Sequence, residues 1–342
     1  MKNIKGLDIG IPLAGIGLFL LLPDAAAAGA RAGLRLCAQL LIPALLPIAV
    51  LAGCLVRSWG GPAPGPVARL MEAVFGLGGA CAPAFLLGQL GGFPLGAQLA
   101  ARLYADGRVT RAEAEHAAAF CNNAGPAFLI GTAGLCLGSP AAGAALMGIQ
   151  LLAALSAGRL LRGGPPPGLS NRPPREGGLS LSRALPQALG SSAEAMLRLT
   201  GAVVFFQALL ACLETLLPLD ALPPPARAGL RGALELSGGI GALRGAEGAF
   251  SFPLAAALVN WGGLCVHLQA AEALSSAGLS PKPYLLGKLV QACFGWVYGG
   301  LYLLLQRAAG PFSLPLLLLA PAGAGFFLFL KKRHWKTRRA VV

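Results

Sequence analysis

The sequence predicts an all-α polytopic membrane protein, and three observations carry that prediction. Of the 342 residues, 56% are hydrophobic and only 12% are charged, about half of the ~25% that is usual in soluble proteins. The mean hydropathy is +0.69. Apolar stretches close to the ~20 residues that a helix needs to cross a bilayer recur along the whole chain. A soluble domain behind a signal peptide does not explain that recurrence.

The first apolar stretch, residues 7–22, is interpreted as a membrane span or anchor. Pro23-Asp24 and four alanines follow it, and these could instead mark the cleavage region of a signal peptide, so that alternative stays open. A longer span is expected at 33–56. A third apolar helix is expected at 74–104, broken by the Gly-Gly-Phe-Pro sequence at 91–94.

A polar, amphipathic helix is predicted from Thr110 to Cys121. Thr110 and Glu113 fit the capping box, in which the first residue caps the helix and a Glu three residues later caps in return. Asn122-Asn123-Ala124-Gly125-Pro126 then interrupts the apolar run. Because each arm around it is too short to cross the bilayer, we expect a re-entrant helical hairpin with its tip at 122–126. An apolar arm to Leu137 and a helix at 140–161 complete this half.

A Pro- and Gly-rich basic segment at 163–183 divides the chain into halves, 1–162 and 184–330. It has no apolar periodicity and is predicted to be a cytoplasmic linker.

The second half repeats the order of the first. We expect a span at 193–217, a helix at 226–244 broken at 237–240, and a second hairpin with its tip at 260–263; spans follow at 283–306 and 312–330. Paired Gly-interrupted apolar segments in corresponding positions are the best sequence indication of a transporter's substrate site. Two pseudo-equivalent halves of inverted topology are therefore predicted.

The net charge of +14 does not indicate nucleic-acid binding. Six of the 27 basic residues lie in the tail 331–342, directly after an apolar run, which is typical of a cytoplasmic flank. The eight cysteines are dispersed through apolar segments without a Cys-x-x-Cys pair, so they are predicted to be small buried hydrophobic residues. Neither a metal site nor a bound cofactor is expected.

Helix breaks suit solute binding because they expose backbone N–H and C=O groups and helix dipoles. Asn122, Asn123 and Asn260 could add amide donors and acceptors, while Gly125 and its counterparts Gly262 and Gly263 let a solute approach the backbone. The alternative is structural: glycines permit close helix packing, and asparagines form hydrogen bonds between helices. Both interpretations stay open.

Charged and polar side chains within apolar helices are further candidates. Glu235 directly precedes Ser237-Gly238-Gly239 and is a candidate for proton or cation coupling, with a structural pair to Arg231 or Arg244 as the alternative. Lys288 could face an anionic solute or extend to the interface. Arg198 could also face an anionic solute, or it could pair with Glu194 at helical spacing. Two further predictions concern Gln89, placed beside the first Gly-Gly pair, and His267, interpreted as a buried structural histidine.

Two runs carry a resemblance to a known family. Residues 88–134, GQLGGFPLGAQLAARLYADGRVTRAEAEHAAAFCNNAGPAFLIGTAG, and residues 258–269, LVNWGGLCVHLQ, resemble the sporulation integral membrane proteins of endospore-forming bacteria that contain a nucleoside-recognition or Gate domain. Within that group they look most like the YlbJ type, also called stage V sporulation protein V. Relatives often have a hydroxyl residue where this chain has Ala124.

The resemblance implies a fold related to concentrative nucleoside transporters and a role in spore formation. It implies that dipicolinic acid is moved across the outer forespore membrane. Dipicolinate is a planar dianion, so a site for it should offer amides, helix N-termini and a cation. The predicted substrate-binding residues are Gln89, Gly91, Gly92, Asn122, Asn123, Gly125, Arg198, Glu235, Ser237, Asn260, Gly262, Gly263 and Lys288.

Other functions remain open alternatives. The same core could carry a nucleoside or a cation, or the protein could be a non-transporting membrane scaffold for spore-envelope assembly. No Walker, Gly-x-Ser-x-Gly or His-Glu-x-x-His motif is present, so an enzyme is not expected. The expected partners are the lipid bilayer and a small anionic solute, with a homo-oligomer as a further possibility.

Overall fold

The computed structural model describes residues 2–58, 65–163, 178–217, 219–246 and 248–309, and within them it contains helices and no strands. The helices before the linker are α1 (Lys2–Leu21), α2 (Pro23–Leu36), η1 (Cys37–Leu41), α3 (Ile42–Ser58), α4 (Gly65–Leu70), η2 (Met71–Phe75), η3 (Gly79–Cys81), α5 (Ala82–Gly91), α6 (Leu95–Ala105), α7 (Arg111–Cys121), η4 (Ala127–Gly134) and α8 (Pro140–Leu160). After it come α9 (Leu181–Leu216), η5 (Leu219–Ala221), α10 (Pro224–Leu234), α11 (Leu236–Gly241), α12 (Ser251–Trp261), α13 (Leu264–Ser276) and α14 (Lys282–Ala309).

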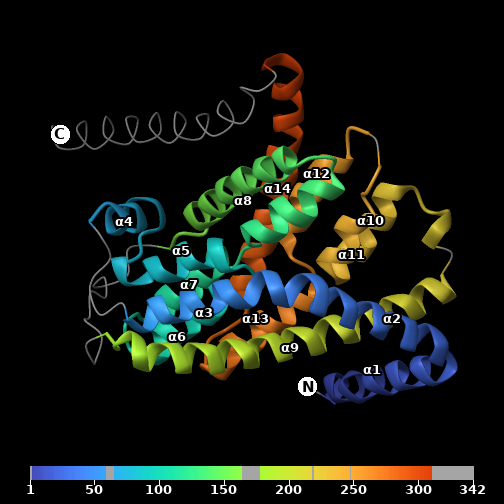
Figure 1. The fold of residues 1–342 in the computed structure, drawn as a ribbon, viewed down its shortest axis with the longest axis horizontal. Helices are drawn as coiled ribbons and strands as arrows, with labels where there is room; N and C mark the ends of the chain where they lie inside the picture. Colours follow the sequence, from blue (N-terminus) through green and yellow to red (C-terminus); the bar gives the residue numbers. More distant parts are fainter. Residues whose placement is uncertain (1, 59–64, 164–177, 218, 247, 310–342) are drawn as a thin grey trace.

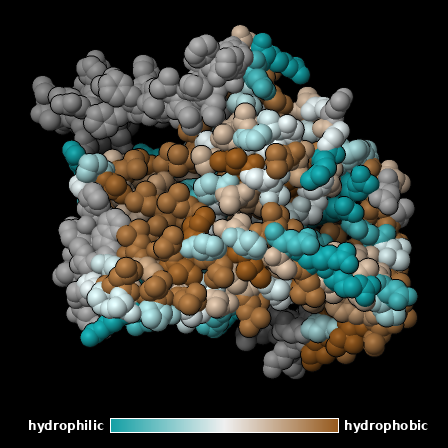
Figure 2. All heavy atoms as spheres, viewed as in Figure 1, coloured by the Kyte–Doolittle hydropathy of each residue, from teal (hydrophilic) through white to brown (hydrophobic). Residues whose placement is uncertain are grey.

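Five helices of the described chain are long and apolar enough to cross a membrane, or six if one bent pair forms a span. Their outer surfaces are apolar as well: Leu51 and Leu197 are 68% and 74% exposed. Apolar side chains cover much of the face seen in Figure 2, with hydrophilic side chains along one side and at the edges. Lipid, not water, is the solvent that suits such a surface.

Two long helices lie side by side along one edge of the protein (Figure 1). One runs without interruption from Pro23 to Ser58 through α2, η1 and α3, and the other is α9. A Cβ atom added at Gly33 would lie 2.9 Å from Val204 Cα, and Gly29, four residues earlier, also meets the α9 backbone. This small-xxx-small pattern lets two membrane helices approach closely.

The predicted spans are present, but several bounds were wrong. The helix expected at 33–56 begins at Pro23, and the one expected at 193–217 begins at Leu181. Residues 74–104 do not form one helix with one break. The segments 65–75 and 79–91 meet at 102°, because Gly76 adopts a left-handed conformation (φ 67°) that ends η2.

The two kinds of break were assigned the wrong way round. α5 and α6 pack against each other across Gly92-Phe93-Pro94, as do α10 and α11 across Glu235, so these pairs are the helical hairpins. α12 and α13 instead continue as one apolar segment of 26 residues, Ser251–Ser276, with α13 below α12 in Figure 1. The break at 262–263 is thus an unwound point within a span, and α7 and η4 likewise do not pack along each other around 122–126.

The second Gly-Gly pair also lies elsewhere than expected. The chain breaks at Glu235, whose carboxylate caps α11, and residues 237–240 are inside that short helix. The order hairpin, broken helix, long helix therefore occurs in both halves: α5–α6, α7–η4 and α8, then α10–α11, α12–α13 and α14. Inverted symmetry between the halves stays a prediction.

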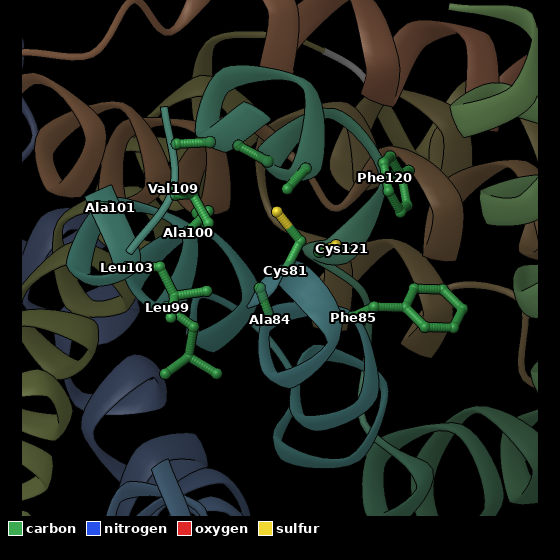
Figure 3. Close-up of a cluster of buried hydrophobic side chains, with 14 of the residues drawn as sticks. Cys81, Ala84, Phe85, Leu99, Ala100, Ala101, Leu103, Val109, Phe120 and Cys121 are labelled. Carbon is green, nitrogen blue, oxygen red and sulfur yellow. The ribbon is translucent and has the colours of Figure 1, made fainter. Parts of the chain in front are cut away.

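A buried apolar cluster fixes the first hairpin against α7 (Figure 3). The Phe75 and Phe120 rings stack with centroids 4.0 Å apart, and Phe85 packs beside both.

Seven of the eight cysteines are buried as predicted, whereas Cys293 is exposed. The capping box of Thr110 and Glu113 is confirmed. The predicted span 312–330, the tail 331–342 and the centre of the linker lie outside the described residues.

Candidate functional site

The hairpin turn and the helix break of the first half meet backbone to backbone. A Cβ atom added at Gly125 would lie 3.2 Å from Gly92 Cα and 3.3 Å from the Leu90 carbonyl oxygen. Gly92 has a φ of 77°, which a side chain would strain. Glycine at both positions therefore allows the turn after α5 to lie directly against the break after α7.

The second half repeats this contact. A Cβ atom at Gly263 would lie 3.1 Å from the Leu234 carbonyl oxygen and from the Leu236 amide nitrogen, the residues on either side of Glu235. The neighbouring Gly262 packs on the other half, because a Cβ atom there would lie 3.1 Å from the Phe93 ring. Both breaks and both hairpin turns thus converge on one region.

A cavity of about 70 Å³ lies in this region. At ~10–15 Å³ per water, it has room for about five waters. Its polar lining comes from four of the predicted residues, Gly92, Gly125, Glu235 and Ser237, together with Thr132 and Gln269. The hydroxyl oxygen of Thr132 and the Oε1 atom of Gln269 are buried without a hydrogen-bond partner, so both are free to bind a solute.

Glu235 is 4% exposed and is held by neutral donors. Its carboxylate accepts from the Ser237 and Gly238 amides (2.9 and 2.7 Å) and from Gln207 Nε2 (2.9 Å). The structural alternative considered for Glu235 is wrong for Arg231, which pairs with Glu214 at 2.5 Å. None of these donors is a cation, and the carboxylate lines the cavity.

Lys288 is fully buried, about two turns from the start of α14. Its ammonium group donates to the Asn122 carbonyl oxygen (3.0 Å) and to Gln291 Oε1 (3.1 Å), and it lies 5.1 Å from the Phe93 ring centroid. All these partners are neutral, and no carboxylate pairs with it among the described residues. Buried charges are normally paired, so Lys288 is the strongest candidate for contact with an anion.

A buried chain of hydrogen bonds extends from this lysine to the second half. Asn122 Nδ2 donates to the Tyr284 hydroxyl (3.4 Å), which also contacts His267 Nδ1 on α13 (2.9 Å). On the other side, Gln291 Nε2 donates to the Ala119 carbonyl near the end of α7 (2.8 Å). α14 therefore ties the first helix break to the second broken helix through polar side chains.

The other two predicted asparagines bond to carbonyls of their own helices. Asn123 Nδ2 donates to the Phe120 carbonyl and Asn260 Nδ2 to the Ala256 carbonyl, both at 2.8 Å. Their Oδ1 atoms are buried without a hydrogen-bond partner. These two amides have a structural role and one free acceptor each.

Gln150 of α8 holds the first break in place. Its amide accepts from the Ala124 amide nitrogen (3.0 Å) and donates to the Ala124 carbonyl (2.9 Å). We expect Gln150→Leu to lower the stability of the purified protein by about 2–4 kcal/mol, because two buried backbone groups lose their partner at ~1–3 kcal/mol each. Thermal unfolding in detergent measures this. An unchanged melting temperature would show that the break does not depend on Gln150.

The structure brings together only part of the predicted set. Asn122 and Lys288 lie in the buried network, and Gly262 and Gly263 pack on the two hairpin turns. Gly91 ends α5 beside Gly92, and Gln89, half-buried on α5, is not among the residues lining the cavity. Arg198 is 53% exposed, pairs with Glu194 (2.7 Å) and Glu272, and does not line the cavity. Its pairing with Glu194 is confirmed, and its part in a substrate site stays a prediction.

Several contributing residues were missed by the sequence interpretation: Phe93, Thr132, Gln150, Gln207, Gln269, Tyr284 and Gln291. The glutamines had a usable signal, because a polar side chain within an apolar helix is costly unless it has a partner. Phe93 and Tyr284 had none, since an aromatic residue in an apolar run is usual.

Comparison with known proteins gives one partial similarity. The chain is 32% identical over 113 residues to the sporulation integral membrane protein YlbJ of Bacillus subtilis (strain 168). The match covers 32% of this chain and 27% of that protein. No family model and no solved structure matches the chain.

This chain is an integral membrane protein. The similarity to a sporulation integral membrane protein and the five or six apolar helices agree on this, and over the matched segment the chain is YlbJ-like. The matched segment is about a quarter of that relative's length, so the activity of the whole relative enters below only as a proposal.

Proposed function

We propose that this protein is a secondary transporter or facilitator for a small anionic solute, with dipicolinic acid as the first candidate. The observation that carries the proposal is the unpaired ammonium of Lys288, buried where two hairpin turns and two helix breaks meet. Broken helices that surround a polar centre are the usual construction of a transporter site. The substrate and the outer forespore membrane come from the family resemblance.

Solute access to Lys288 requires movement in this proposal. The cavity is smaller than an aromatic dicarboxylate needs, and the Phe93 ring contacts both the cavity and the lysine. Phe93 belongs to the turn of the α5–α6 hairpin. A shift of that hairpin would enlarge the cavity and expose the ammonium to a carboxylate of the solute.

Uptake into proteoliposomes tests the proposal directly. Purified protein is reconstituted and offered radiolabelled dipicolinate, uridine, or an alkali cation at equal concentration. Saturable dipicolinate uptake that exceeds uptake into protein-free vesicles is expected. Saturable uptake of uridine or the cation alone would contradict the anion assignment.

One observation favours the alternative of a nucleoside or cation path. A carboxylate, Glu235, lines the cavity, and the described lining contains no cation. In the anion proposal this carboxylate must be neutralised when a dianion enters, so we infer that Glu235 takes up a proton or cation together with the solute.

Glu235→Gln separates these roles. Glutamine keeps an oxygen acceptor for the α11 amides but cannot carry the compensating proton or cation, so we expect downhill dipicolinate uptake to persist and uphill accumulation to disappear. Uptake with and without an imposed ion gradient measures both. Glu194→Gln is the matched control, because it removes an exposed carboxylate outside the cavity. Undiminished accumulation in Glu235→Gln would exclude the coupling role.

A further inference from the structure

A second, larger cavity shares no lining residue with the first. Its volume is about 470 Å³, and four segments line it: the end of η2, α7, the residues after α8 and the start of α14. α8 and α14 are candidate spans that end at Leu160 and begin at Lys282. The cavity therefore lies where two membrane helices meet the aqueous boundary.

The basic groups of this cavity are free to attract an anion. Arg162 packs on Gly76 and donates to the Ala73 carbonyl (3.2 Å), a neutral acceptor. Lys282 is exposed, and its ammonium has no hydrogen-bond or ion-pair partner among the described residues. Neither cation is neutralised by a described carboxylate.

The acidic groups of the cavity are engaged elsewhere. Glu113 accepts from the Thr110 amide at 2.8 Å in the capping box. Glu115 accepts from Arg111 Nε and from the Ser280 amide, both at 2.9 Å. His116 adds an imidazole to the lining. Because Arg111 compensates Glu115, the two basic groups of the lining face one carboxylate, Glu113, and the net charge of the cavity is positive.

One side of the cavity, at Ala119, is close to the buried lysine; it is called the floor below. The Ala119 carbonyl accepts from Gln291 Nε2 (2.8 Å). Gln291 in turn accepts from Lys288 Nζ (3.1 Å). Two hydrogen bonds therefore separate the floor of this cavity from the proposed anion contact.

We propose that the cavity between α7, α8 and α14 is an entrance site in which Arg162 and Lys282 collect a carboxylate-bearing solute and deliver it toward Lys288. The inference rests on the proposed transport function and adds to it a second site with its own residues. Clefts lined by one sign of charge raise the local concentration of an oppositely charged solute.

The charge claim is tested without any transport assay. Ala112→Cys places a thiol on the exposed lining of the cavity, in a chain whose exposed Cys293 is replaced by serine. The thiolate attacks a methanethiosulfonate reagent, forming a mixed disulfide and releasing methanesulfinate. We expect an anionic reagent to react faster than a cationic one, and Arg162→Gln with Lys282→Gln to lower the ratio of the two rates by about tenfold.

Arg159→Gln with Arg307→Gln is the matched control, because it removes two exposed positive charges that do not line the cavity. This pair should leave the rate ratio unchanged. An equal effect of the two double variants would overturn the inference, since the charge effect would then be general. Saturating dipicolinate should also protect the introduced thiol.

An anionic lipid headgroup offers the cavity the same chemistry as a carboxylate-bearing solute. Nanodiscs of different lipid composition distinguish these two occupants. If phosphatidylglycerol protects the thiol and dipicolinate does not, the cavity binds lipid and the inference is wrong. In proteoliposomes, the Arg162 and Lys282 double variant should raise the KM for uptake several-fold at an unchanged saturating rate. Charge-dependent labelling in a chain without any uptake would reject the proposed function and retain the anion site.

Discussion

Replacing Lys288 by methionine is expected to abolish solute uptake while leaving the protein about as stable as before. Methionine fills a similar volume, and the desolvation cost of a buried ammonium, several kcal/mol, is removed. Against this, the Asn122 carbonyl and Gln291 Oε1 lose a donor at ~1–3 kcal/mol each. The two effects nearly cancel in stability. Uptake is lost because no other cation among the described residues lies where the hairpin turns and helix breaks meet, so no other side chain there can bind an anionic solute by its charge.

The measurement combines initial dipicolinate uptake in proteoliposomes with thermal unfolding of the purified protein. Arg307→Met, at the exposed end of the same helix, is the control and should change neither quantity. Normal uptake in Lys288→Met would remove the residue from the site. A large loss of stability would instead show that the lysine is needed to hold Asn122 and Gln291 in place, which is a structural role.

The predictable part of this fold is the part fixed by local sequence. Apolar length gave the long helices α8, α9 and α14. Thr110 and Glu113 gave the start of α7 through a capping box that operates over one turn. Gly92, Gly262 and Gly263 marked chain breaks because their positive φ angles favour glycine. Each of these signals depends on residues within a few positions of one another.

Hairpins and broken spans could not be distinguished in this way. Both are two apolar arms around a polar or Gly-containing break, and only contacts between the arms separate them. The break at Glu235 shows the same limit: a glutamate caps α11 there, while the more conspicuous Gly238-Gly239 continues the helix. Likewise, Lys288 gave no indication of its partners, because Asn122 is 166 positions away along the chain.

Gly96→Ala is expected to be among the most destabilising single-methyl changes in the protein. A Cβ atom at Gly96 would collide with the carbonyl group of Cys121 and lie 2.7 Å from Asn122 Cα. Gly88, on the other arm of the hairpin, meets the same carbonyl. Both arms thus pack directly on the end of α7, and a backbone cannot yield as a flexible side chain can. We expect a loss of ~3 kcal/mol or more, or a melting temperature lower by roughly 5–10 °C.

Gly201→Ala is the matched control, since Gly201 lies within α9 and has no atom within 4 Å of an added Cβ. Alanine favours a helix over glycine by about 1 kcal/mol, so the control should be neutral or stabilising, and any loss in Gly96→Ala is steric. The collision would also push the first hairpin away from the break, where Asn122 accepts from the Ala97 amide (3.5 Å) and from Lys288. Uptake should therefore fall together with stability in Gly96→Ala, whereas Lys288→Met loses uptake alone. If Gly96→Ala lost stability but kept normal uptake, the contact between hairpin and break would not be what positions the lysine.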